Sequence, residues 1–188
     1  MKRTGVGFKA ITRRVKSLDG ASVEFGILDP EAFMMVGGSD DGTHKISLGH
    51  LAHIMEEGRT YVHKGGSFSL TNKKGESVFV NIKKGSIIHI PARPFFSTAY
   101  YNNLNILKTM MADGFKSVLN GKKNARSVLS LIGRFMRTEI KSSIAGGNFV
   151  TLSLLQEWKK GHNRPLRDSG TLYRAVKYRY IPKNKKKT

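Results

Sequence analysis

Pro91 and Pro94 constrain this chain more strongly than any other local feature. They lie in the segment Ile90–Phe96, between a stretch rich in β-formers and a long amphipathic stretch. Each proline fixes φ and removes a backbone donor, and the residue before each is driven toward extended geometry. The segment is therefore predicted to be a stiff extended arm that delivers Phe95 and Phe96 to the start of a helix.

The spacing of apolar residues predicts the other elements. Gly58 is expected to end the helix that Ser47 begins, and Asp113-Gly114 to bend the first long helix. A glycine- and aspartate-rich loop is expected over 34–47. Helices are expected over 6–18, 47–57, 96–119 and 125–144, a helical turn over 152–160, strands over 23–27, 67–70, 77–82 and 86–90, and a short helix passing into a strand over 172–180.

Together these elements predict an α+β fold. We expect an antiparallel β-sheet, made of a meander plus N- and C-terminal strands, packed by two long α-helices. Residues 1–181 are expected to form a single domain, and residues 182–188 a basic disordered tail.

Composition excludes several classes of function. The chain of 188 residues has no cysteine, so disulfides, thiol catalysis and cysteine-based zinc sites are ruled out. No window approaches the ~20 apolar residues of a membrane span, and the N-terminus lacks the apolar region of a signal peptide. We therefore expect a soluble protein with no membrane contact.

Charge is the strongest global feature. The chain has 33 Lys and Arg against 13 Asp and Glu, a net charge of +20, and residues 19–57 hold eight of those acids with a single lysine. This balance predicts attraction to nucleic acid or to an acidic protein surface, although a basic helix face is often merely solvated. Phosphate contact of this kind carries no sequence information. The candidates for polyanion contact lie near the two termini: Lys9, Arg13, Arg14, Lys183, Lys185, Lys186 and Lys187.

The sequence offers no convincing catalytic or metal site. His50, His53, Glu56 and Glu57 share a helix, but their spacing is not that of a zinc protease motif, and a polar helix face explains them better. Ser169 lacks the flanking glycines of a nucleophile elbow. We predict no enzyme activity, no cofactor and no metal. Asp168 or Ser169 is instead expected to cap the helix that begins near Leu172, with Gly170 allowing close backbone approach.

Three motifs in order resemble the tail-completion (neck, or head–tail joining) proteins of tailed bacteriophages. They are a helix end over 48–58 that includes Glu56 and Gly58, the Pro-Ala-Arg-Pro-Phe run at 91–95, and the segment 165–176 that includes Asp168, Ser169, Gly170 and Leu172. The resemblance covers roughly residues 45 to 180. The chain departs from the family pattern in having Glu57 in place of an aromatic residue, Phe96 in place of leucine and Ser169 in place of threonine.

The resemblance implies a structural virion protein, assembled in the host cytoplasm, that forms a ring of six between the tail and the head–tail connector. Its partners would be further copies of itself, connector or adaptor proteins, and tail-tube or terminator proteins, with transient contact to genomic DNA. Candidate interface residues are Pro91, Arg93, Pro94, Phe95 and Phe96, together with Met34 and Met35 of the predicted loop. For Phe95 and Phe96, packing in their own core is an equal alternative.

Two other functions remain open from the sequence. A tail terminator or another minor tail protein would share the ring architecture. A non-enzymatic nucleic-acid-binding protein would use the basic termini and the alternating basic and aromatic residues at 177–180.

Overall fold

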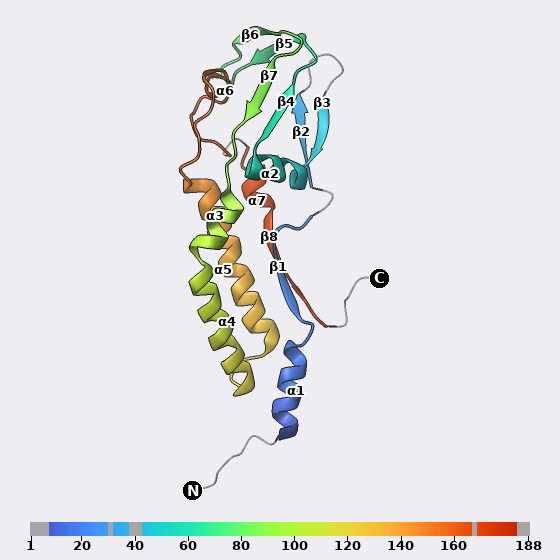
Figure 1. The fold of residues 1–188 in the computed structure, drawn as a ribbon, viewed down its shortest axis with the longest axis vertical. Helices are drawn as coiled ribbons and strands as arrows, with labels where there is room; N and C mark the ends of the chain where they lie inside the picture. The colour runs from blue at the N-terminus through green and yellow to red at the C-terminus, as the bar shows by residue number, and fades with distance from the viewer. Residues whose placement is uncertain (1–7, 30–31, 38–42, 167–168, 184–188) are drawn as a thin grey trace. The chain divides into compact units, whose positions relative to one another are not determined.

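A computed structural model describes residues 8–29, 32–37, 43–166 and 169–183 and confirms the α+β class. The chain forms two compact units, each built from segments that are far apart in the sequence (Figure 1). Unit 1 draws on the ranges 1–28, 98–141 and 176–188, and unit 2 on 29–97 and 142–175. The single domain over 1–181 stays a prediction, and most of the predicted tail lies outside the described residues.

Unit 1 is a two-stranded ribbon covered by helices. It contains α1 (Phe8–Leu18), β1 (Ser22–Ile27), α4 (Leu104–Leu119), most of α5 (Ala125–Gly146) and β8 (Val176–Ile181). The predicted terminal strands pair with each other in antiparallel register, from Ser22 opposite Ile181 to Ile27 opposite Val176. The buried core comes mostly from one stripe of the long helices: Leu107, Val118, Val128, Ile132, Met136 and Ile140.

Two glycines set how closely the elements of unit 1 approach. A Cβ added to Gly133 would lie 2.6 Å from both Tyr178 and Val23, so this glycine lets α5 press against the β1–β8 ribbon. A Cβ on Gly114 would lie 2.2 Å from a methyl group of Val128. Gly114 therefore serves the packing of α4 against α5.

The predicted helix over 96–119 is in fact two helices, and the prediction of a bend at Asp113-Gly114 was wrong. The break lies at Asn103, which separates α3 (Phe95–Asn102) from α4 and has φ −108° and ψ 8°. Its side-chain amide donates to the carbonyl of Ala99 at 2.9 Å and to Glu139 at 3.2 Å. A partner on another helix thus fixes the break, which the sequence of 96–119 alone does not show.

Unit 2 holds the remaining elements, except that α3 begins in it at Phe95 and passes into the range of unit 1 at Thr98. The predicted loop over 34–47 was wrong, because β2 (Phe33–Gly37) and β3 (Thr43–Ser47) pair as antiparallel strands. The helix α2 (Leu48–Glu57) has Ser47 at its N-cap position, although the serine side chain makes no cap bond, and Gly58 ends it with φ +75° as predicted. The unit also contains α6 (Leu154–Lys160) and α7 (Thr171–Ala175).

The predicted meander, and the single sheet built on it, were wrong. Among the described residues the strands form four separate two-stranded sheets. β5 (Gly66–Thr71) pairs with β6 (Ser77–Ile82), whereas β7 (Ile87–Ile90) pairs with β4 (Arg59–Val62), a strand that the sequence did not reveal.

These four strands make one long hairpin over residues 59–90, in which β4–β7 leads into β5–β6 (Figure 1). We call this element the hairpin arm. At its bend, the His63 N–H donates to the Ser86 carbonyl at 2.8 Å and the Gly85 N–H donates to the His63 carbonyl at 2.9 Å. These two hydrogen bonds keep the two sides of the hairpin next to each other. A turn at 83–86 therefore leaves β7 opposite β4 and away from β6.

Candidate assembly surface

The three sequence motifs meet in unit 2, where α7 of the third motif contacts α2 and the extended arm lies against the end of α2. The N–H of Arg93 donates to the carbonyl of Met55 at 2.7 Å. A Cβ added to Gly58 would lie 2.7 Å from the nitrogen of Ala92 and 2.8 Å from the oxygen of Ile90. Only a residue without a side chain, with positive φ, fits between α2 and the arm.

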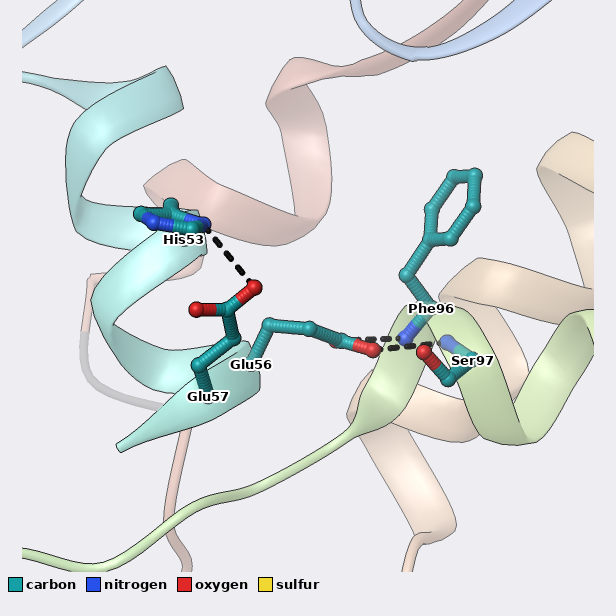
Figure 2. Close-up of polar contacts among 5 residues, drawn as sticks. All are labelled: His53, Glu56, Glu57, Phe96 and Ser97. Atoms are coloured by element: carbon teal, nitrogen blue, oxygen red, sulfur yellow. Dashed lines mark hydrogen bonds and ion pairs between the residues drawn. The ribbon is translucent and has the colours of Figure 1, made fainter.

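Glu56 fastens the arm to α2. Its two carboxylate oxygens accept the N–H groups of Phe96 at 2.9 Å and Ser97 at 2.7 Å, in the first turn of α3 (Figure 2). A helix leaves its first N–H groups without intrahelical partners, and a carboxylate there is also favoured by the helix dipole. Glu56 therefore caps a helix that begins about forty residues later in the chain.

Its neighbour Glu57 has no comparable role. That side chain is largely exposed and lies 3.6 Å from His53 on the same helix (Figure 2). Exposed pairs of this kind contribute little to stability. In the described part of the chain, no three His, Asp or Glu side chains gather as a metal site would require.

Arg93 points into the unit and is only 4% exposed. Its Nε donates to the carbonyl of Val150 at 3.4 Å, and Nη1 lies 3.6 Å from the sulfur of Met55. Desolvation by burial lowers the pKa of the guanidinium. Arg93 thus joins the arm to the chain that follows α5 and is not placed to contact another subunit.

The predicted interface residues of the extended arm (90–96) fall into two groups, one buried and one at least partly exposed. Phe95 is 3% exposed, so of the two alternatives left open for this residue the structure has the own-core packing. Phe96 and Pro91 are half-buried, and Pro94 is exposed. Met34 and Met35 lie in β2, but their side chains fall outside what the structure describes.

The third motif forms a helix start. The Ser169 hydroxyl accepts the N–H of Thr171 at 3.3 Å, which is the predicted capping contact, and also lies 2.6 Å from the Thr171 hydroxyl. Gly170 has φ +71°, and Leu172 is buried. Asp168 lies outside the described residues.

The polyanion candidates are not a single surface. Lys9 and Arg13 are exposed on α1, whereas the half-buried Arg14 donates to the carbonyl of Leu119 at 2.7 Å. Lys183 forms an ion pair with Asp19. Lys185, Lys186 and Lys187 lie outside the described residues.

Sequence reasoning missed the most exposed apolar side chains of unit 2 that lie on strands. Val62 and Ile87 face each other across β4 and β7 and are 66% and 72% exposed, and Phe79 of β6 is 77% exposed. Short strands whose apolar residues are largely exposed show no clear alternation of apolar and polar residues, so the sequence pattern did not identify these exposed side chains. We call Val62 and Ile87 the apolar pair.

The hairpin arm also has open edges. Each of its strands pairs with one other strand among the described residues, so every strand has a second edge without a neighbour in a sheet. Such an edge can accept a strand from another chain.

An open hollow of about 440 Å³ elsewhere in unit 2, lined by 144–149 and 163–165, includes one titratable residue, Arg164.

No protein-family model, curated protein or solved structure matches this chain. Of the helices in the described ranges, none is both long and apolar enough to cross a membrane.

Proposed function

We propose that this protein is a structural component of a tailed-phage virion, a neck or tail-completion protein whose copies form a ring between the tail and the head–tail connector. The resemblance of its three ordered motifs to that family supports the proposal. The contacts of Glu56, Gly58 and Arg93 support it further, because they give two of those motifs a shared scaffold role.

The hairpin arm is the observation that carries the proposal. An isolated two-stranded ribbon is marginally stable in water, and it gains stability when another surface covers it. Covering Val62 and Ile87 would contribute roughly 1.5–3 kcal/mol for each side chain that becomes fully buried. An arm of this kind suits a protein whose final environment includes neighbouring subunits.

Charge decides how copies would meet. The hairpin arm has a single acid, Glu76, against Arg59, Lys64, Lys73, Lys74, Lys83 and Lys84. Two such arms repel each other, so an arm is expected to contact a different surface of the next copy. Heterologous contacts of this kind close into rings when the rotation allows.

Deletion of the gene from its phage tests the assignment directly. We expect lysates with filled heads and full-length tails that are not joined, and joining is restored by the purified protein. Joined virions with abnormally long tails would identify a terminator instead, and normal virions would refute a structural role.

The apolar pair provides the matched test of assembly. The variant Val62→Thr, Ile87→Thr should fail to restore joining and should shift the protein toward monomer in sedimentation velocity. The control Val150→Thr, Leu154→Thr changes two side chains of unit 2 that are 56% and 86% exposed but lie outside the arm. The control is expected to behave as the unmodified protein, and equal behaviour of the two variants would remove the arm from the interface.

A further inference from the structure

Three lysines gather at the bend of the hairpin arm. Lys64 follows β4, and Lys83 and Lys84 follow β6. They lie on the two sides of the hairpin arm, which the backbone hydrogen bonds of His63 hold together. A Cβ added to Gly65 would lie 3.1 Å from the Cβ of Lys84, so the stretch after Lys64 lies directly against Lys84. All three lysine side chains are exposed.

Lys64, Lys83 and Lys84 form no ion pair within the described residues. Lys116–Asp113, Arg179–Glu24 and Lys183–Asp19 are ion pairs among the described residues, and none of these three involves the bend. The single acid of the arm, Glu76, accepts the side-chain amide of Asn72 at 2.6 Å, at the tip of the hairpin. Like charges held together by backbone contacts repel, and an external anion relieves that repulsion.

The length of the arm favours an extended anion. Lys73 and Lys74 lie in the turn between β5 and β6, at the far end of these strands from the bend. Six strand residues at about 3.3 Å each place the two basic groups roughly 20 Å apart. A compact anion would reach one group, whereas a linear polyanion reaches both.

Duplex DNA has the shape and charge that fit this arm. It carries a negative charge about every 1.7 Å along its axis, and its major groove admits a two-stranded β-ribbon. Lysine contacts a phosphate as a point charge without bidentate geometry, so such binding is independent of sequence.

We infer that the hairpin arm binds the phosphate backbone of duplex DNA, through Lys64, Lys83 and Lys84 at its bend and the lysines at its tip. This site is separate from the terminal residues to which the sequence assigned polyanion contact. The inference does not rest on ring formation or on a place in a virion. Binding through a few lysines is weak and strongly salt-dependent, so DNA that reaches the arm can also move past it.

The test is a salt titration of binding to a fluorescent 30-base-pair duplex, followed by anisotropy. The variant Lys64→Gln, Lys83→Gln, Lys84→Gln is compared with Lys108→Gln, Lys122→Gln, Lys123→Gln, which removes the same charge from exposed lysines of unit 1. Each phosphate contact contributes about 0.9 to the slope of log affinity against log salt, so the bend variant should lose about 2.7 from that slope. Between 50 and 200 mM salt, the unmodified protein and the control should therefore lose about 40-fold more affinity than the bend variant.

The inference would be overturned by no binding of the unmodified protein at 50 mM salt, by equal slopes for the two variants, or by a bend variant that loses binding to labelled polyglutamate but not to DNA. The last result would identify an acidic protein surface as the partner. Single-stranded DNA of the same length is the second probe. A loss of slope seen with the single-stranded DNA alone would also contradict duplex binding. Sedimentation of the same samples separates this inference from the proposed function, since a monomer that keeps the slope difference would refute the ring and leave DNA binding in place.

Discussion

Replacement of Glu56 tests whether the two motifs form one scaffold. Glu56 accepts two N–H groups at the start of α3, from Phe96 and Ser97, at 2.9 and 2.7 Å. In Glu56→Ala both N–H groups lose their acceptor while the surrounding backbone stays partly buried. In Glu56→Gln one acceptor oxygen remains, but the negative charge and the second acceptor are lost.

The expected cost follows from the type of contact. Hydrogen bonds to a charged group contribute about 1.5–3 kcal/mol, and loss of a helix cap costs about 0.5–2 kcal/mol. Because this site is partly buried and water can replace part of the contact, we expect a loss of about 2 kcal/mol for Glu56→Ala and about 1 kcal/mol for Glu56→Gln. For a chain of this size, about 2 kcal/mol corresponds to a fall in Tm of roughly 4–8 °C.

Glu57→Ala is the matched control, because it removes the same charge one residue away. Glu57 is largely exposed and pairs with His53, so we expect a change within about 0.5 kcal/mol. Calorimetry gives Tm for the three variants, and amide hydrogen exchange gives the local effect. The amides of Phe96 and Ser97 should exchange faster in both Glu56 variants and at the normal rate in Glu57→Ala. Equal losses of stability for Glu56→Ala and Glu57→Ala, or unchanged exchange at Phe96 and Ser97, would refute the capping role.

Three further predictions concern the same unit. Gly58→Ala should destabilise the protein by about 3 kcal/mol or more, because it adds a backbone clash at 2.7 Å to an unfavourable φ. The control Gly75→Ala has a positive φ but open space around it, so it should cost only about 1 kcal/mol. Similar urea midpoints for the two variants would contradict the clash. Arg93→Met should change the free energy of unfolding by less than about 1.5 kcal/mol, because the buried charge has weak partners. Arg93→Ala should cost about 2–4 kcal/mol because it leaves a cavity. Urea titration distinguishes the two variants, and a large loss of stability in Arg93→Met would show that the charge itself is needed. Val62→Thr with Ile87→Thr should leave Tm within about 2 °C, because both side chains are wet, so that any loss of assembly in sedimentation reports the interface and not unfolding.

Much of the local structure was determined by the sequence. The apolar spacing predicted a helix over 125–144, close to the observed α5 (Ala125–Gly146), and a short helix passing into a strand over 172–180, which are α7 and β8. The C-terminal glycine of α2, Gly58, and the capping contact of Ser169 follow from chemistry within a few residues. These features were predictable because helix periodicity, caps and turns depend on near neighbours in the chain.

The tertiary structure alone decided which segments meet. The pairing of β7 with β4 depends on the turn at 83–86, and the break at Asn103 depends on Glu139 of another helix. In the sequence Arg93 and Phe95 were candidate interface residues, with own-core packing an equal alternative for Phe95, whereas in the structure both are buried and Arg93 donates to the distant Val150. Strand partners, burial and remote caps are contacts between residues far apart in the chain, and their energies depend on a geometry that no local pattern contains.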